Sequence, residues 1–297
     1  MKHISVLLNE SLDGLSIKEG DVFVDGTLGG GGHTLEVLNR FGNKITTICF
    51  DLDKDAIQRV EKKIDPNFKK VYLENAGFQD LKKILSKIGI NKVNRILLDL
   101  GISSFQLEEA GRGFSFLRDE PLLMTMKKEP GSDDITAHEI VNFWEEQTLS
   151  DIIYGFGEER FARRVAKAIC EARQQKEIKT TFDLVEIIEK AIGRSYKGKK
   201  IHPATKTFQA LRIATNSELT NLEKVIEDGF EALDHGGRMA IISFHSLEDR
   251  IVKRAFKNFE NTGRAKVVNK KPILPQEEEI KENPRSRSAK LRVLEKI

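Results

Sequence analysis

The stretch that decides the fold reads Val22-Phe-Val-Asp25-Gly-Thr-Leu-Gly-Gly-Gly-Gly-His33. Its apolar start predicts a short strand that ends at the carboxylate of Asp25, and the glycines precede a helix that begins near Thr34. Glycine adopts positive φ and has no Cβ, so a ligand can lie against the peptide N–H groups of such a loop. In an open α/β sheet, nucleotides bind beyond the carboxyl ends of the strands. The stretch therefore predicts an α/β fold with a ligand site there.

A second carboxylate supports a nucleoside ligand. The apolar run at residues 45–50 is followed by Asp51, twenty residues after Gly31, where a carboxylate can accept hydrogen bonds from ribose hydroxyls. The glycine spacing does not fit the G-x-G-x-x-G pattern of dinucleotide sites, which argues against a nicotinamide-dependent oxidoreductase. The pattern Asp25-x-Thr27-x-Gly29-x-Gly31 instead resembles the first motif of class I S-adenosylmethionine (SAM) methyltransferases. The alternative, a flexible loop without a ligand, is disfavoured because both neighbouring strands end in an acid.

Composition sets broad limits. The chain has 297 residues, of which 39% are hydrophobic and 32% charged, as expected for a globular protein with roughly two domains or one α/β domain with a large insertion. We find no targeting segment and no apolar run long enough to span a membrane, so we expect a cytoplasmic protein. Two cysteines, Cys49 and Cys170, indicate neither a disulfide framework nor a metal site.

Hydrophobic patterning predicts how the chain is organised. Strands are expected at residues 21–25, 45–51, 69–73, 95–100 and 238–244, and helices at 33–41, 54–64 and 78–88 alternate with the first four. Between the fourth and fifth strands the periodicity is helical, with helices expected at 158–173, at 181–192 with Gly193 as the stop, and at 216–233. Closing strands are expected at 267–268 and 291–295. We therefore predict a sheet domain of residues 1–106 and 216–297, interrupted by a helical insertion of residues 107–215.

The fourth strand delivers Asp99, followed by Ser103 and Ser104. In a SAM-dependent fold this position lies beside the reactive methyl group, and methyl transfer is an in-line displacement that needs alignment and exclusion of water. Residues 99–113 contain no cysteine, which disfavours covalent attack on a pyrimidine ring carbon. Transfer to an amino group remains, with these three side chains as candidate acceptors for its N–H groups; for the serines, a purely structural turn is equally well supported.

Two further residues have both a functional and a structural interpretation. Phe78 follows the third strand and is placed to cover an adenine ring, with core packing as the alternative. His245 follows the fifth strand directly. A lone histidine is more often a hydrogen-bonded structural residue than a base, and no metal-binding set around it is evident from the sequence.

One basic stretch indicates a polyanionic partner. The segment from Arg194 to Arg212 contains six Lys or Arg residues and no acid, and it includes an aromatic residue, Phe208. Such segments can contact RNA phosphates and bases, although charge alone is explained equally well by solubility. The candidate RNA-binding residues are Lys197, Lys199, Lys200, Lys206 and Arg212.

Several motifs in order, across nearly the whole chain, resemble the RsmH/MraW family of small-subunit ribosomal RNA (cytosine-N4)-methyltransferases. Among them are Val24-Asp-Gly-Thr27-x-Gly29-x-Gly-Gly-His33, Leu97-Leu-Asp-Leu-Gly-Ile-Ser-Ser104, His202-Pro-Ala-Thr-x-Thr-Phe-Gln-Ala-Leu-Arg-Ile213 and Asn283-Pro-Arg-Ser-Arg-Ser-Ala-Lys-Leu-Arg292.

The resemblance implies a class I SAM-dependent methyltransferase with a Rossmann-like sheet, no metal, and a helical insertion that helps to bind RNA. The implied reaction is methylation of the N4 amine of a cytidine in the decoding region of small-subunit ribosomal RNA, within the assembled subunit. A SAM-binding ribosome-assembly factor with weak or no methylation is the alternative. The implied cofactor contacts are Gly31, Gly32, His33, Asp51, Phe78, Asp99 and Gln106.

One segment departs from the family pattern. Where the family usually reads Pro-Leu-Asp-Met-Arg-Met-Asp, this chain reads Pro121-Leu-Leu-Met-Thr-Met-Lys127. Leu123, Thr125 and Lys127 thus replace two carboxylates and a guanidinium, while the cofactor residues match. We expect any consequence on the substrate side, in the form of a less ordered loop and slower turnover.

Overall fold

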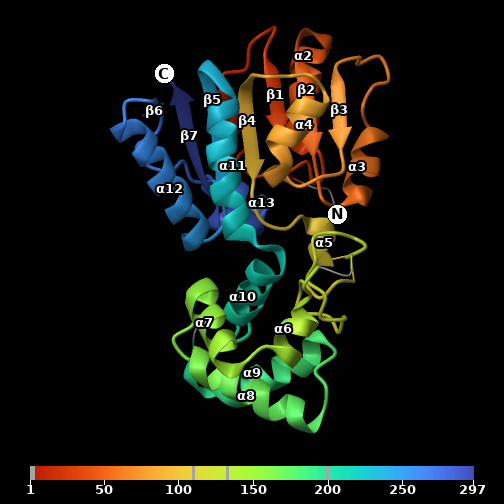
Figure 1. Cartoon of the computed structure of the whole chain (residues 1–297), viewed down its shortest axis with the longest axis vertical. Helices are drawn as coiled ribbons and strands as arrows, with labels where there is room; N and C mark the ends of the chain where they lie inside the picture. Colours follow the sequence, from red (N-terminus) through yellow and green to blue (C-terminus); the bar gives the residue numbers. More distant parts are fainter. Residues whose placement is uncertain (1–3, 109–110, 132–133, 199–200) are drawn as a thin grey trace. The chain divides into compact units, whose positions relative to one another are not determined.

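The computed structural model describes residues 4–108, 111–131, 134–198 and 201–297, and it divides into two compact units (Figure 1). Unit 1 comprises the residues up to Gly101 and those from Leu219 onward, and unit 2 comprises residues 102–218. The insertion predicted at residues 107–215 falls inside unit 2.

Within its described residues, unit 1 forms a seven-stranded sheet in the order β3-β2-β1-β4-β5-β7-β6. β1 to β5 are parallel, and β7 is antiparallel to both β5 and β6. The strand order reverses between β1 and β4, and such a switch point is where open α/β sheets bind ligands. The strands are β1 (Val22–Asp25), β2 (Thr46–Phe50), β3 (Val71–Glu74), β4 (Val93–Asp99), β5 (Leu233–Ser243), β6 (Ala265–Val267) and β7 (Lys290–Lys296).

Helices cover both faces of this sheet because its strands alternate apolar side chains between two cores. Ile96 and Leu98 of β4 face the helices α4, α11 and α12, whereas Leu97 between them faces α1 and α2. The helical segments of unit 1 are α1 (Leu8–Leu15), α2 (Gly32–Phe41), η1 (Gly42–Lys44), α3 (Lys54–Glu61), η2 (Phe78–Asp80), α4 (Leu81–Lys87), α11 (Glu218–Ala232, whose first residue belongs to unit 2), α12 (Ser246–Asn261), α13 (Glu277–Glu282) and η3 (Pro284–Ser288).

The α/β class and all seven predicted strands are confirmed, with shifts at their ends. The largest shift is in β5, which was expected at 238–244 and begins at Leu233. Gly236 has a φ of 73°, and the register between β4 and β5 shifts between Val93 and Arg95, so an irregular start hides the strand from a pattern search. Among the helices of unit 1, α1, α12 and α13 were not predicted.

Unit 2 is helical throughout its described secondary structure, apart from one isolated bridge between Pro121 and Thr180. Its own apolar core is built from α6 to α10, with Leu149, Ile169 and Leu211 fully buried. Capping boxes begin α6 (Thr136 with Glu139) and α9 (Thr180 with Asp183). Its helices are α5 (Ser104–Glu108), α6 (Ala137–Phe143), α7 (Glu146–Gly157), α8 (Ala162–Gln175), α9 (Thr181–Tyr196) and α10 (Thr205–Asn216).

Two predicted helix ends in unit 2 are wrong. The helix expected from residue 158 begins at Ala162, because Glu158 is left-handed (φ 49°) and caps α7. The helix expected to stop at Gly193 continues to Tyr196, whose buried hydroxyl donates to the carboxylate of Glu159. A tertiary contact thus overrides the weak helix propensity of glycine.

Both cysteines are buried and free. No helix in the described part of the chain is long and apolar enough to cross a membrane.

Candidate cofactor site

The loop between β1 and α2 is held by the carboxylate of Asp25. This side chain accepts hydrogen bonds from the backbone N–H of Thr27 at 3.1 Å and from the hydroxyl of Thr34 at 2.7 Å. Asp25 is only 2% exposed, and burial raises the pKa of its carboxyl group. Asp25 therefore shapes the loop from inside rather than offering a free carboxylate to a ligand.

The glycines serve packing as well as backbone exposure. Gly31 has a φ of 80°, and a Cβ there would lie 2.6 Å from a methyl carbon of Val60 on α3. A Cβ on Gly32 would lie 1.8 Å from the hydroxyl oxygen of Ser5. Our sequence interpretation assigned these positions to ligand approach alone, and it missed that protein atoms fill both Cβ directions.

Asp51 follows β2 and faces the same loop. Its two carboxylate oxygens accept hydrogen bonds from the backbone N–H groups of Gly29 at 2.7 Å and Asp53 at 2.8 Å. Burial raises the pKa of Asp51 to about 6, despite these two hydrogen bonds. Each oxygen retains capacity for a further donor, as a ribose diol would require.

Asp99 ends β4 next to the loop. Its backbone N–H donates to the hydroxyl of Thr27 at 2.6 Å, and its Oδ1 has no hydrogen-bond partner among the described residues although it is buried. Burial, followed by the charges of Asp25, Glu248 and Glu279, raises the pKa of Asp99 well above its usual value. An unsatisfied carboxyl oxygen at a topological switch point is a candidate ligand-binding atom.

His33 lies in the first turn of α2 and is 5% exposed. Its Nε2 is 3.2 Å from the carbonyl oxygen of Val6, which only an N–H can approach as a donor, and its Nδ1 is 3.9 Å from Asp99 Oδ2. The ring thus links the N-terminal segment to Asp99.

Phe78 opens η2 beside the start of the glycine loop. Its Cβ lies 3.3 Å from the position that a Cβ on Gly26 would take, and the side chain is partly buried against the sheet core. The structure thus brings Phe78 to the loop that also contacts Asp51 and Asp99 and packs it against the sheet core, while its contact with an adenine ring stays a prediction.

Gln106 belongs to unit 2, where it has a local structural role. Its side-chain oxygen accepts the backbone N–H of Ser103 at 2.9 Å, and the Ser103 hydroxyl accepts the N–H of Gln106 at 3.2 Å. This reciprocal pair caps α5. The side chain of Ser104 lies outside the described part of the structure.

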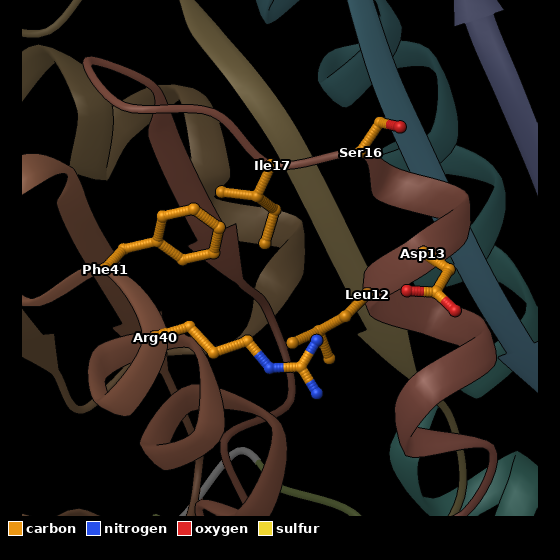
Figure 2. Close-up of a pocket in the computed structure, with 6 residues that line it drawn as sticks. All are labelled: Leu12, Asp13, Ser16, Ile17, Arg40 and Phe41. Carbon is orange, nitrogen blue, oxygen red and sulfur yellow. The ribbon is translucent and has the colours of Figure 1, made fainter.

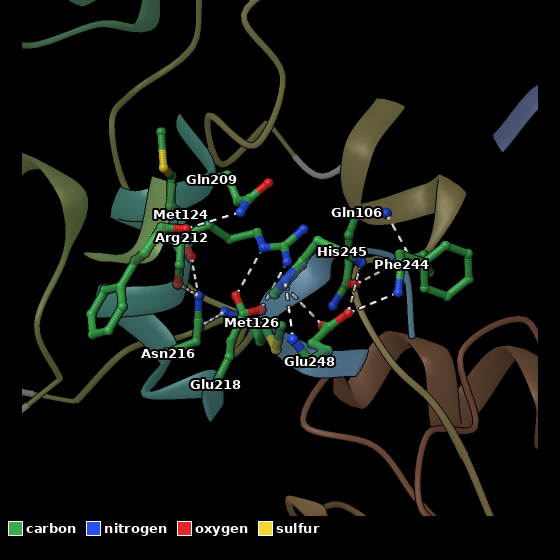
Figure 3. Close-up of polar contacts among 12 residues, drawn as sticks. Gln106, Met124, Met126, Gln209, Arg212, Asn216, Glu218, Phe244, His245 and Glu248 are labelled. Carbon is green, nitrogen blue, oxygen red and sulfur yellow. Dashed lines mark hydrogen bonds and ion pairs between the residues drawn. The ribbon is translucent and has the colours of Figure 1, made fainter. Parts of the chain in front are cut away.

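His245 has a structural role, as expected for a lone histidine. It is the N-cap of α12 and forms a capping box with Glu248, whose carboxylate accepts the N–H of Phe244 at 2.8 Å (Figure 3).

The predicted RNA-binding residues differ in how they are engaged. Lys197 is exposed after α9, and Lys206 donates to the carbonyl oxygen of Glu158 at 2.6 Å. Arg212 forms two 2.8 Å hydrogen bonds with Glu218, an acid just beyond the acid-free stretch (Figure 3). Lys199 and Lys200 lie outside the described residues.

The segment that departs from the family pattern is well connected within unit 2. Asn216 donates to the carbonyl oxygen of Met124 at 2.7 Å and accepts the N–H of Met126 at 2.8 Å (Figure 3). Arg112 donates to the carbonyl oxygens of Thr125 at 3.0 Å and Met126 at 2.7 Å. These contacts hold the backbone whatever side chains stand at 123 and 127, so the structure gives no support to the expected loss of order.

A surface pocket lies at the C-terminal end of α2, away from the glycine loop. A hollow of about 240 Å³ is lined by residues of α1 and of the end of α2 and the segments next to them (Figure 2): Leu12, Asp13, Ser16, Ile17, Arg40 and Phe41. The Arg40 guanidinium donates to Glu36 and Asn9. The ten residues of α2 separate this hollow from the glycine loop by roughly 15 Å.

Comparison with known proteins agrees with the motifs. The family model described as the MraW methylase family matches residues 1–297. The chain is 44% identical to "Ribosomal RNA small subunit methyltransferase H" of Clostridioides difficile (strain 630), over 99% of both chains. It is 41% identical to the protein of the same name from Finegoldia magna, over 100% of this chain and 99% of the relative. Among solved structures, an rRNA methylase from Streptococcus thermophilus aligns with a TM-score of 0.47 at 12% identity, over 100% of this chain and 99% of that one.

Proposed function

Because this chain belongs to the MraW methylase family, we propose that it transfers a methyl group from SAM to the N4 amine of a cytidine in the decoding region of small-subunit ribosomal RNA. Its relatives are named small-subunit ribosomal RNA methyltransferases, which supports the RNA class. The observation that carries the cofactor is the meeting of Asp51, Asp99 and the glycine loop at the switch point of the sheet.

The cofactor is S-adenosylmethionine, and the product is S-adenosylhomocysteine. Asp51 accepts the ribose hydroxyls while two backbone N–H groups hold its carboxylate in place. Phe78, whose Cβ lies beside Gly26, would cover the adenine. Gly31 and Gly32 would hold the amino-acid portion. His33 and Asp99 complete the proposed contacts of unit 1, and Gln106 remains a proposed contact from the sequence.

The chemistry is direct transfer to nitrogen. Cys49 lies inside β2, where burial raises the pKa of its thiol, and Cys170 is buried in the helical core of unit 2. Neither thiol is placed to attack a pyrimidine ring. A carboxyl oxygen of Asp99 can accept an N–H of the target amine, which frees the nitrogen lone pair from conjugation with the ring and aligns it with the methyl group.

RNA is bound by exposed cations of unit 2. Arg160, Arg163, Arg194 and Lys197 are exposed and have no ion pair among the described residues. The guanidinium of Arg160 stacks on the ring of Phe161 at 4.5 Å from its centroid, which limits its conformational freedom before RNA arrives. We call these four residues, with Lys206, the cationic surface. Lys199 and Lys200 remain proposed contacts from the sequence.

The second candidate is an assembly factor that binds SAM but methylates weakly. It is favoured only by the departure at Leu123, Thr125 and Lys127. Thr125 is 4% exposed and its hydroxyl donates to the carbonyl oxygen of Lys127, so this chain closes the segment with local bonds instead of charged side chains.

One experiment separates these functions. The protein is incubated with labelled SAM and small subunits that lack the modification, and the RNA is digested for nucleoside mass spectrometry. We expect N4-methylcytidine at one position per subunit. SAM binding without a product would indicate the assembly factor, and 5-methylcytidine would contradict direct transfer to nitrogen.

A further inference from the structure

The N-terminal segment Ile4–Leu7 lies against the first turn of α2. The hydroxyl of Ser5 occupies the space beside Gly32, and the carbonyl oxygen of Val6 is bonded to the ring of His33. Any shift of this short segment therefore moves protein atoms at two of the proposed cofactor-binding positions.

The segment does not hold its shape through local bonds alone. Leu7 has a φ of 49° and a ψ of 41°, a left-handed conformation that a branched side chain rarely adopts, and it starts α1 without a side-chain cap. Its side chain is fully buried, so packing fixes one side of the residue. The backbone needs further partners to keep this conformation.

Those partners come from the other end of the chain. The Leu7 N–H donates to Glu279 Oε1 at 2.8 Å, and Asn283 donates its side-chain N–H to the carbonyl oxygen of Ile4 at 3.2 Å. Glu279 belongs to α13, and Asn283 is its C-cap. The segment is thus held on one side by the C-terminal region and contacts α2 on the other.

Glu279 also acts on the site through its charge. Burial raises the pKa of Glu279, and its carboxylate is one of the charges that raise the pKa of Asp99. Glu279 is therefore connected to the proposed site in two ways: through its hydrogen bond to the segment Ile4–Leu7, and through the electrostatic effect of its carboxylate on Asp99.

We propose that Glu279 and Asn283 are positioning residues for the cofactor: through Ile4–Leu7 they hold Gly32 and His33 in the geometry that binds SAM. This inference rests on the proposed function, since SAM is the ligand. Neither residue touches the cofactor in this scheme. Under this proposal, SAM binding depends on hydrogen bonds that the C-terminal region makes to the N-terminal segment.

The test is calorimetric titration of SAM into Glu279→Ala, Glu279→Gln and the matched control Glu278→Ala. Glu278 is the exposed neighbour on α13 and has no described partner. Glu279→Ala should weaken SAM binding about tenfold, because the hydrogen bond to a charged acceptor is lost. Glu279→Gln should retain most of the affinity, since its amide oxygen can still accept the Leu7 N–H, and the control should match the wild type.

A thermal melt of each variant separates positioning from simple stability. The proposal is overturned if Glu279→Ala lowers the melting temperature but binds SAM within twofold of wild type well below it. If that variant does not fold, Asn283→Ala takes its place, and unchanged SAM affinity there is equally fatal. Failure of the wild type to bind SAM would instead refute the proposed function.

Discussion

The cofactor edge of unit 1 (Asp25, Asp51, Asp99 and the glycine loop) and the cationic surface of unit 2 treat charge in opposite ways. At the cofactor edge Asp25 is buried, Asp51 and Asp99 are partly buried, and burial raises the pKa of each. On the cationic surface Lys206 is partly exposed, the other four side chains are exposed, and all five lie outside the helical core. The first arrangement costs stability unless a ligand uses it, whereas the second costs little and responds to salt.

The largest expected effect tests how tightly the cofactor edge is built. Gly31→Ala should lower the free energy of unfolding by about 3 kcal/mol, because strained φ and a clash with Val60 add together. Gly20→Ala is the matched control, with a φ of 89° and no atom of the described residues within 4 Å of its Cβ position, and should cost about 1 kcal/mol. Urea denaturation measures both. Equal losses would show that the loop relaxes around a Cβ.

The next prediction tests whether the partly buried carboxylate of Asp51 binds the ligand. Asp51→Ala should weaken SAM binding by roughly 1.5–3 kcal/mol, the typical contribution of hydrogen bonds to a charged acceptor. Lys197→Ala, on the cationic surface, should leave SAM affinity unchanged. Calorimetry decides the point, and undiminished affinity in Asp51→Ala would mean that the ribose is held elsewhere.

The affinity of the cofactor edge for SAM should depend on pH. The pKa of Asp51 is about 6, so protons compete with ribose hydroxyls as the pH falls through that value. SAM affinity should therefore fall about tenfold from pH 8 to pH 5. The folding stability of the free protein should change in the opposite direction to SAM affinity. Because the pKa of Asp51 is raised in the folded state, this group contributes stability fully below the unfolded pKa of 3.8, and the contribution is lost as the pH rises through about 6. Asp51→Asn should remove this part of the pH dependence, and a profile identical to wild type would assign it to another group.

Much of the cofactor edge could be predicted because its signals are local. A strand, an acid and consecutive glycines follow one another, and β1, β2 and β4 each end in an aspartate or are followed by one. The packing of Val60 and Ser5 against the glycines could not be predicted, since these contacts depend on how α3 and the N-terminal segment fold back.

Less of the cationic surface could be predicted from the sequence. The sequence assigned Arg212 to an acid-free stretch, but the turn after α10 brings Glu218 to its guanidinium. Arg194 lies far in sequence from Arg160 and Arg163, and only the structure shows that none of the three forms an ion pair with a described residue.

Removing charge from the cationic surface should change how small-subunit binding depends on salt concentration. Replacing Arg160, Arg163 and Lys197 together with Gln should lower the slope of log K against log salt for small-subunit binding by about 2, since each lost phosphate contact removes roughly 0.7. The control replaces Lys167, Lys176 and Lys190, which carry the same charge but pair with acids. Equal slopes of log K against log salt in the two variants would indicate that the cationic surface serves solubility and does not contact RNA.

The smallest effect concerns the segment that departs from the family. Lys127 forms an exposed ion pair with Asp134 at 2.6 Å. Lys127→Ala should therefore change the free energy of unfolding by less than about 1 kcal/mol and leave SAM binding intact. A larger loss in chemical denaturation would show that this pair, rather than Arg112 and Asn216, fixes the segment.

The central claim, that the cofactor edge binds SAM, is tested most directly by a crystal structure of the protein with S-adenosylhomocysteine. We predict both ribose hydroxyls within hydrogen-bond distance of the Asp51 carboxylate, the adenine against Phe78 and the sulfur beside Asp99. Ligand density at the far end of α2, among Leu12, Arg40 and Phe41, or a ribose without contact to Asp51, would contradict it.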